Sequence, residues 1–258
     1  MTHVVLKLGG NVVLDPAQVA LVATELKALL AAGHQATLIH GGGPQLDKAL
    51  TALGEPVVKI EGLRVTSPKA AATVQQVMDQ IGKDLATALA NAGVPTRHVP
   101  SSPQVLQAIP KVVEGGDVGR VGTVKGCHLT PIAGKVLVVT PVGFDAKGPL
   151  NVNADEGACA VAAALKVPWL ILGTDVSAVR DAAGTSLERL TPTTAKALIG
   201  GAATGGMIPK LRSASEALAH GVGRVLITKV QPGTVTNAIL KGKADGTLLE
   251  PDAKAVKA

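Results

Sequence analysis

Apolar residues along the chain recur in two alternating patterns, one typical of buried strands and the other of helices. Short continuous apolar runs cover residues 4–8, 36–40 and 137–141, as in strands that are buried on both faces of a sheet. Residues 16–32 and 68–91 instead carry apolar side chains at helical spacing. This alternation predicts strands that are separated by helices, as in a parallel sheet.

The same alternation continues to the end of the sequence. A helix is predicted over the Ala-rich residues 156–166 and a strand over 169–172. Shorter elements follow, with helices at 191–199, 206–220 and 234–241 and strands at 224–228 and 247–249. Residues 95–126, rich in Val and Gly, predict short strands and turns. The fold class is therefore α/β with a mainly parallel central sheet, in which ligands bind at the carboxyl ends of the strands.

Length and composition narrow the class of protein. The chain has 258 residues, of which 47% are hydrophobic and 17% charged, and this predicts an ordered globular protein of one large or two small domains. Its apolar runs stop short of the roughly 18 residues that a membrane span needs. The first residues lack the basic and apolar regions of a signal peptide. We therefore expect a cytoplasmic protein without a membrane partner.

The aromatic, cysteine and histidine content argues against a nucleic-acid-binding protein, a disulfide-rich protein and a metal site. The net charge of +6 would suit a nucleic-acid-binding protein, but Phe144 and Trp169 are the only aromatic residues, which excludes a base-stacking surface. Binding of small anionic ligands explains the excess of basic over acidic residues at least as well. Cys127, Cys159 and the six scattered histidines have no spacing typical of a disulfide framework or a metal site. We expect no nucleic-acid partner and no metal held by protein side chains.

Two glycine-rich turns follow the first two predicted strands. Gly9 and Gly10 follow the first strand, and residues 41–43 link the second strand to a helix that begins near Pro44. In such an arrangement, backbone N–H groups can close on a phosphate group. The second turn fits neither common fingerprint, since Leu46 replaces the third glycine of the dinucleotide pattern and the sequence contains no Gly-Lys-Ser/Thr. A phosphate site and an ordinary turn therefore both remain open here.

Three polar features lie at positions that suggest a binding site: the segment 151–155, Lys210 and Lys7. Residues 151–155, Asn-Val-Asn-Ala-Asp, come directly before the Ala-rich helix, where they act either as an ordinary cap or as part of an anion site. Lys210 lies in the first turn of a later helix, where the helix dipole disfavours a cation unless an anion is bound. The alternative for Lys210 is a solvated surface lysine. Lys7 is a cation near the end of an apolar strand.

Five motifs occur in the order typical of the amino acid kinase family. They are Lys7-Leu8-Gly9-Gly10, His40-Gly41-Gly42-Gly43-Pro44, Gly62-Leu63-Arg64-Val65-Thr66, Asn151-Val152-Asn153-Ala154-Asp155 and Gly206-Met207-Ile208-Pro209-Lys210. The chain resembles this family from Val4 to about Leu249. The third and fourth motifs are typical of the family members that phosphorylate N-acetyl-L-glutamate.

The resemblance implies a three-layer αβα sandwich with two lobes. Residues 1–166 would bind the amino acid and form a homodimer, with its seam along the long helix around Val74 to Leu89. Residues 167–258 would bind ATP. The implied reaction is phosphorylation of the side-chain carboxylate of N-acetyl-L-glutamate in arginine synthesis, with Mg2+ held mainly through the ATP phosphates.

The resemblance also implies a role for individual residues. The catalytic residues would be Lys7, Asp155 and Lys210, with a lysine on each side of the transferred group and Asp155 holding the two in register. This agrees with phosphoryl transfer, which depends on positioning and charge neutralisation. Arg64 would clamp the substrate α-carboxylate with its planar fork. Further substrate-binding residues would be Gly42, Gly43, Asn151 and Asn153. ATP would be bound by the two lysines as well, Lys7 and Lys210, together with Gly9, Gly10, Gly43, Thr174 and Asp175.

Two other functions stay open. A related kinase would act on aminoadipate or glutamate attached to an acidic amino-group carrier protein, which the basic net charge would suit, but Gly-Leu-Arg-Val-Thr favours the free acylated amino acid. A non-catalytic nucleotide or amino-acid sensor would share the fold, although all three catalytic residues are retained. Residues 97–110, 126–134 and 229–233 depart from the family's pattern, the second segment being too short for a helix.

Overall fold

A single large sheet forms the centre of the computed structural model, which describes residues 1–203 and 205–252. Its strands are β1 (His3–Leu8), β2 (Gln35–His40), β5 (Thr96–Val99), β8 (Val136–Val139), β11 (Trp169–Gly173), β14 (Arg189–Leu190), β15 (Arg224–Thr228) and β16 (Thr247–Leu249). They form an eight-stranded sheet in the order β14-β16-β15-β11-β1-β2-β8-β5. Neighbouring strands are parallel except for β15 and β16. The predicted mainly parallel sheet is confirmed.

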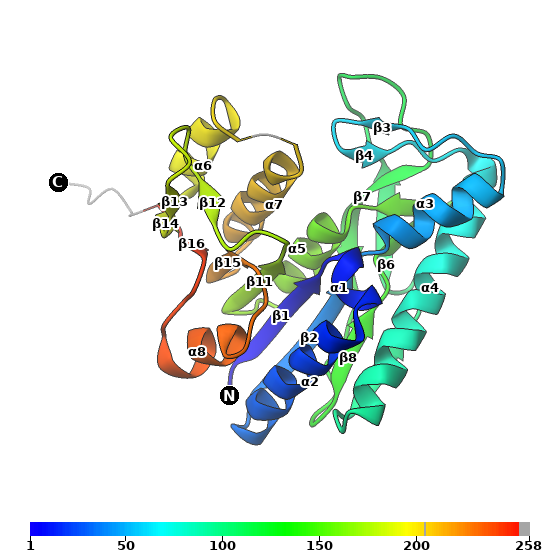
Figure 1. Ribbon diagram of the computed structural model, residues 1–258. Coiled ribbons are helices and arrows are strands. Elements are labelled where there is room, and N and C mark those ends of the chain that lie inside the picture. The colour runs from blue at the N-terminus through cyan, green and yellow to red at the C-terminus, as the bar shows by residue number, and fades with distance from the viewer. Residues whose placement is uncertain (204, 253–258) are drawn as a thin grey trace.

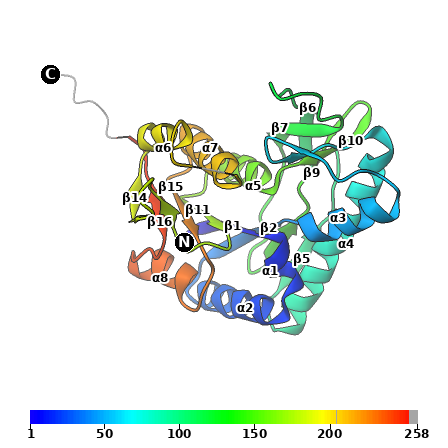
Figure 2. The same cartoon turned by 45° about the horizontal axis from the view of Figure 1, so that its top comes forward.

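Helices cover both faces of this sheet, which confirms the three-layer sandwich (Figure 1). In Figure 2, α2 (Pro16–Ala31) and α8 (Thr234–Lys241) lie below the sheet, on the same face as the long helix α4 (Pro68–Asn91). The helices α5 (Ala154–Ala164), α6 (Pro192–Ile199) and α7 (Met207–Ala219) lie above it. Successive side chains of β1 enter the two cores in turn: Val4 and Leu6 pack with α2, and Val5 packs with α5 and α7.

Short polar side chains cap the first turns of several of these helices. Asp15 accepts two backbone N–H groups at the start of α2, and Ser67 accepts one at the start of α4. Thr191 and Thr194 form a capping box at the start of α6. Asn153 caps α5, so this helix begins one residue before Asp155 and places that carboxylate in its first turn.

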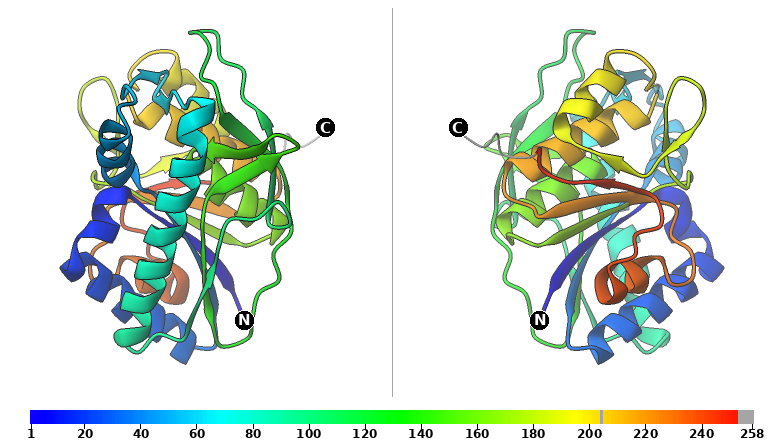
Figure 3. Two further views of the ribbon diagram at one scale, coloured as in Figure 1. Left: turned by 90° about the vertical axis from the view of Figure 1, so that its right-hand side faces the viewer. Right: turned by 90° about the vertical axis from the view of Figure 1, so that its left-hand side faces the viewer.

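A small closed barrel packs beside the sheet, against α4 and α5. Its strands are β6 (Leu106–Pro110), β7 (Val121–Cys127), β9 (Val142–Asp145) and β10 (Gly148–Val152). Figure 3 shows these strands next to the long helix α4. The pattern predicted short strands before residue 126 but not β9 or β10, because their two glycines and a proline hide the strand signal. Asn151 therefore lies in a strand that pairs with β7 rather than in a helix cap.

The remaining elements near the carboxyl ends of the strands are short. They are α1 (Gly10–Leu14), α3 (Gly43–Ala52) and the strands β3 (Lys59–Ile60), β4 (Leu63–Arg64), β12 (Val179–Arg180) and β13 (Ser186–Leu187). The strands β3 and β4 form a hairpin that contains Arg64. The sequence did not predict α1, which has only five residues.

The large sheet runs through the boundary predicted between residues 166 and 167. β1 from the first part pairs with β11 from the second, so both predicted lobes share one sheet. The division into two lobes remains a prediction, and residues 204 and 253–258 of the second lobe lie outside the described residues. The apolar stripe of α4, including Val74 and Leu85, packs in the cores of this chain. The homodimer along α4 therefore also remains a prediction.

Candidate active site

Four of the five sequence motifs meet at one cavity at the carboxyl ends of β1 and β2. The cavity has a volume of about 250 Å³. It is lined by Lys7, Gly10, Gly41, Gly42, Gly43, Leu46, Lys59, Gly62, Leu63, Arg64, Met78, Val121, Asn151, Val152, Asn153 and Ala154. The sequence-predicted residues of the first four motifs are therefore brought together, and the fifth motif joins them through a contact of Lys210.

The two glycine-rich turns touch each other through their backbones. A Cβ atom on Gly10 would lie 2.9 Å from the backbone nitrogen of Gly43, and one on Gly41 would lie 3.0 Å from the nitrogen of Gly10. Any side chain there would separate the turns. Helix α3 begins at Gly43 without a side-chain cap, so its first N–H groups are left for a ligand. This geometry favours an anion, such as a phosphate group, between the turns.

Asp155 lies between two buried lysines. Its Oδ1 is 2.8 Å from Lys7 Nζ, and its Oδ2 accepts a hydrogen bond of 2.8 Å from Lys210 Nζ. Lys7 and Lys210 are only 8% and 6% exposed. Burial alone would raise the pKa of Asp155, but the charges of Lys7 and Lys210 outweigh it and lower the pKa to about 2. The carboxylate is therefore ionised and holds both ammonium groups in place.

These three residues come from three elements that the fold brings together. Lys7 is the penultimate residue of β1, and Asp155 and Lys210 lie in the first turns of α5 and α7, which pack against each other. Burial lowers the pKa of Lys210, and the charge of Asp155 opposes this change. One carboxylate for two cations leaves a local excess of positive charge, which an anionic ligand would balance.

Arg64 lies beside the second glycine turn. Its Nη2 donates to the main-chain oxygen of Gly43 at 3.2 Å, and its Nη1 donates to the carboxylate of Asp47 in α3. Burial lowers the pKa of the Arg64 guanidinium. Asp47 was not predicted from the sequence, nor was Lys59, which lines the same cavity. Neither had a signal in the sequence, since both fall at positions typical of surface residues.

Asn151 and Asn153 reach the cavity from consecutive elements. Asn151 Nδ2 donates to the hydroxyl of Thr66 at 3.0 Å. Asn153 Oδ1 accepts the N–H groups of Asp155 and Glu156 at 2.9 and 3.3 Å. The oxygen of Asn153 is thus used in the cap, which orients the first turn of α5.

Besides Lys210, three predicted ATP-binding residues do not line this cavity. The main-chain oxygen of Gly9 accepts the N–H groups of Val12 and Val13 and so starts α1. Thr174 and Asp175 follow β11, and the Thr174 hydroxyl donates to Asp175 Oδ1 at 3.0 Å. Their proposed contact with ATP remains a prediction.

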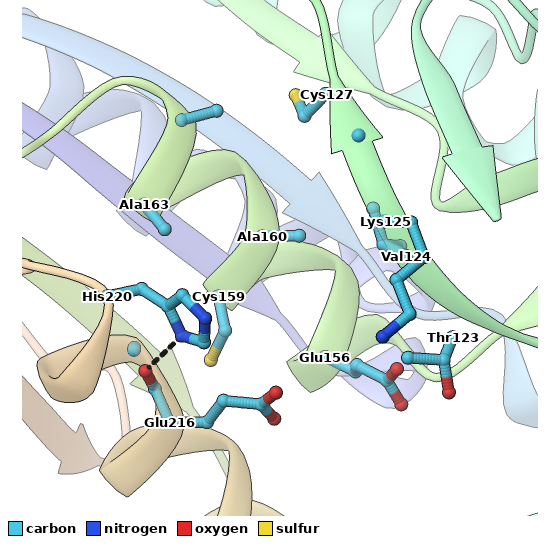
Figure 4. A pocket seen from close by; sticks show the side chains of 13 residues that line it. Thr123, Val124, Lys125, Cys127, Glu156, Cys159, Ala160, Ala163, Glu216 and His220 are labelled. Atoms are coloured by element: carbon cyan, nitrogen blue, oxygen red, sulfur yellow. Dashed lines mark hydrogen bonds between the residues drawn. The ribbon is translucent and has the colours of Figure 1, made fainter.

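A second cavity lies between β7, α5 and α7 and is shown in Figure 4. It has a volume of about 310 Å³, and neither Lys7 nor Lys210 lines it. Burial raises the pKa of Cys127 to about 11 and that of Cys159 well above its usual value, so neither thiol is a nucleophile at neutral pH. The Glu156 carboxylate is already paired with Lys111 Nζ at 2.5 Å. The chemistry of phosphoryl transfer thus fits the first cavity.

The described part of the chain contains neither a group of metal ligands nor a membrane-spanning helix. Across residues 1–203 and 205–252, no three His, Cys, Asp or Glu side chains are grouped so that they could hold a metal ion. In the same part of the chain, no helix has both the length and the apolar character needed to cross a bilayer.

Comparison with known proteins identifies the family. The model of the amino acid kinase family matches residues 2–229. An acetylglutamate kinase of Rubrobacter xylanophilus is 36% identical over 257 residues, which cover 98% of each chain. Carbamate kinase from Giardia lamblia bound to AMP-PNP has a TM-score of 0.69 at 19% identity, over 97% of this chain and 99% of that one.

A further structural neighbour is longer than this chain. N-acetylglutamate synthase from Neisseria gonorrhoeae, complexed with coenzyme A and N-acetyl-glutamate, has a TM-score of 0.83 at 24% identity. The match covers 98% of this chain but only 60% of the synthase chain. At these identities the two structures show the fold alone. The family match over most of the sequence, together with the full-length relative, shows that this chain belongs to the amino acid kinase family.

Proposed function

We propose that this chain transfers the γ-phosphoryl group of ATP to the side-chain carboxylate of N-acetyl-L-glutamate, as a step of arginine synthesis. The observation that carries the proposal is the buried Lys7–Asp155–Lys210 group, placed next to a cavity that contains Arg64. The full-length similarity to an acetylglutamate kinase supports the choice of acceptor. The products would be ADP and an acyl phosphate.

The reaction needs no general base from the protein. A substrate side-chain carboxylate is already ionised above its ordinary pKa of about 4.3. One of its oxygens forms a bond to the γ-phosphorus while the bond from that phosphorus to the ADP oxygen breaks. Asp155 is unsuited to take up a proton, because its pKa is about 2 and both its oxygens face lysines. Its role in this proposal is to position the two cations.

Lys7 and Lys210 supply the charge that the reaction requires. The acceptor carboxylate, the transferred group and the leaving ADP are all anionic, so their approach is costly without cations between them. Fixed ammonium groups in a buried site stabilise the spread of negative charge without reorganising. In this proposal the backbone N–H groups of Gly10 and Gly43, one in each glycine turn, donate hydrogen bonds to the oxygens of the transferred phosphoryl group.

Arg64 and Asn151 bind the amino-acid end of the acceptor in this proposal. The guanidinium fork is suited to a carboxylate, and Arg64 is fixed at the edge of the cavity by Gly43 and Asp47. The substrate would then lie between Arg64 and Lys7, within the predicted first lobe (residues 1–166). ATP would approach from the second lobe (residues 167–258), which contributes Lys210.

The donor set at the site fits Mg2+ that is held through the ATP phosphates. The cavity is lined by lysines, an arginine and amide groups. The carboxylate of the catalytic residue Asp155 already forms ion pairs with two lysines. Among the described residues that line the cavity there is no carboxylate to hold a hard cation directly. When bound with ATP, Mg2+ would neutralise part of the phosphate charge.

The proposal is tested by offering ATP with N-acetyl-L-glutamate, L-glutamate or 2-acetamidoadipate. ADP release is measured with a coupled assay, and hydroxylamine traps an acyl phosphate as a hydroxamate. We expect kcat/KM for N-acetyl-L-glutamate to exceed that for the other two by about a hundredfold or more. Turnover of none of the three, or preference for another acceptor, would refute the proposal. Activity that appears only with a protein-linked glutamate or aminoadipate would point to the carrier-dependent kinase.

A further inference from the structure

Thr66 is fully buried, at 0% exposure, and its hydroxyl group joins two residues of the cavity. The hydroxyl donates to the main-chain oxygen of Arg64 at 3.0 Å. It also accepts a hydrogen bond of 3.0 Å from the side-chain amide of Asn151. The main-chain oxygen of Arg64 can only accept, so the single proton of the hydroxyl is used in that hydrogen bond. The Asn151 amide must therefore be the donor in the other one. Thr66 therefore connects the hairpin β3–β4 directly to β10.

The main chain of Thr66 is held from its other side by the loop before β7. Its N–H donates to Val118 O at 3.1 Å, and its own oxygen accepts from the N–H of Arg120 at 2.6 Å. Gly119 makes this approach possible: its φ is +64°, and a Cβ there would lie 2.3 Å from the oxygen of Thr66. The N–H of Asn151 donates in turn to Arg120 O at 2.8 Å. Thr66 and Asn151 are thus linked twice.

Arg120 is itself anchored in the small barrel. Its guanidinium donates to both carboxylate oxygens of Asp145 at 2.8 Å, and to the oxygens of Gly148 and Pro149 at 2.9 and 3.0 Å. The hydrogen bonds from Arg120 lower the pKa of Asp145 to about 2, so the pair is ionised at neutral pH. The ion pair ties β9, β10 and the loop that holds Thr66 into one rigid unit.

We propose that Thr66 is a positioning residue for the amino-acid substrate: its hydroxyl sets the spacing of Arg64 and Asn151 and the orientation of the Asn151 amide. This inference rests on the proposed function. Because Nδ2 of the planar amide faces Thr66, Oδ1 points to the other side of the group. Asn151 then offers an acceptor to the ligand, and Arg64 offers donors.

Such a pair matches a ligand with one N–H group and one carboxylate on the same carbon. An N-acylated amino acid has this arrangement, since its amide N–H is a donor without charge and its α-carboxylate accepts from a guanidinium. If the Asn151 amide turned over, its N–H groups would face the substrate N–H, and the contact would become unfavourable. Loss of the hydroxyl therefore weakens binding at the amino-acid end and not at the phosphates.

Thr66→Val and Thr66→Ser separate the hydroxyl from the rest of the side chain. Thr66→Val keeps the shape and removes both hydrogen bonds, whereas Thr66→Ser keeps the hydroxyl. We expect Thr66→Val to raise KM for N-acetyl-L-glutamate about tenfold, the effect of about one hydrogen bond, and to leave KM for ATP within about twofold. Thr66→Ser should stay within about threefold of the wild type for both substrates.

Thr247→Val is the matched control. Thr247 is also 0% exposed, and its hydroxyl accepts from the N–H of Val179 at 2.8 Å and donates to Leu187 O at 2.6 Å. It lies in the second half of the chain, away from the amino-acid end. We expect Thr247→Val to lower Tm about as much as Thr66→Val does, and to leave KM for N-acetyl-L-glutamate unchanged.

Three outcomes would overturn the inference. They are an unchanged KM for N-acetyl-L-glutamate in folded Thr66→Val, an equal rise of KM for both substrates, and a loss in Thr66→Ser as large as that in Thr66→Val. If Thr66→Val does not fold, Thr66→Ser decides alone, because a tenfold loss there would assign the effect to the methyl packing. A wild-type enzyme that turns over a different amino acid would refute the proposed function, and Thr66 would then be tested with that substrate.

Discussion

Replacement of Asp155 by Asn is the most direct test of the proposed reaction centre. The change keeps the shape of the side chain and removes the one negative charge between Lys7 and Lys210. Both ammonium groups lie within 2.8 Å of that carboxylate and are almost fully buried. In Asp155→Asn they would face each other across a neutral amide. We expect them to separate or to lose a proton, so that neither stays in register with the transferred group.

The size of the effect follows from the contacts. The pKa of about 2 lies almost two units below the usual 3.8 of an Asp, and at about 1.4 kcal/mol per unit this gives the ionised form roughly 2 kcal/mol of stabilisation. Removal of one partner from a buried ion pair costs about 3–5 kcal/mol. Loss of a fixed group that stabilises transition-state charge lowers kcat by about 10²–10³. We therefore expect kcat to fall by about 10²–10³ and KM to change less.

Glu156→Gln is the control for this experiment, because Glu156 is the next residue of the same helix turn and is also paired with a lysine, Lys111. We expect it to keep kcat within a few fold. The effects of Asp155→Asn and Lys210→Met should also fail to add, since both act through one contact. A folded Asp155→Asn variant with kcat close to that of the wild type would refute the role of Asp155. So would a double variant that shows the full sum of the two single losses.

Three further predictions concern other residues. Arg64→Ala should raise KM for N-acetyl-L-glutamate by roughly ten- to a hundredfold and leave KM for ATP nearly unchanged; equal weakening of both in steady-state kinetics would argue against the assignment. Burial lowers the pKa of His40 to about 4, so between pH 6.5 and pH 4 the unfolded chain binds a proton that the folded chain does not, and stability falls as the pH falls. Urea denaturation should show a loss of about 2 kcal/mol between pH 6.5 and pH 5 that is smaller in His40→Gln; an equal loss in both proteins would contradict this. Glu25→Gln should lower stability by about 1–3 kcal/mol, because the buried carboxylate accepts N–H groups from Gly233, Val235 and Thr236; an unchanged denaturation midpoint would show that these bonds contribute nothing.

The order of strands and helices was largely predictable from the sequence. The central strands are buried on both faces, so they appear as continuous apolar runs such as Val4–Leu8. The long helices show a polar face and a cap residue, as at Ser67. Elements whose stability comes from distant partners gave no such signal. β9 and β10 are strands because they close a barrel with β6 and β7, and the sequence of residues 142–152 alone does not favour them.

The same difference separates the predicted site residues from those that the sequence missed. Lys7 lies in an apolar strand and Lys210 in the first turn of a helix, and a cation is unfavourable at both positions. Such a conflict between residue type and position indicates a functional residue. Thr66 and Asp47 occupy positions that are ordinary for their residue type. Their importance comes from contacts across 85 and 17 residues of sequence, with Asn151 and Arg64. Only the folded chain shows these contacts.

A buried charge is not by itself a sign of function, and Glu25 shows the difference. Its carboxylate is as buried as that of Asp155, yet its partners are backbone N–H groups and the Thr236 hydroxyl, which are neutral donors at the start of α8. These donors fully explain why an acidic residue stands there. Asp155 has two cations around one negative charge, and among the described residues no second carboxylate forms an ion pair with either lysine. The excess positive charge faces a cavity bordered by helix N-termini, so only an anionic ligand completes the site.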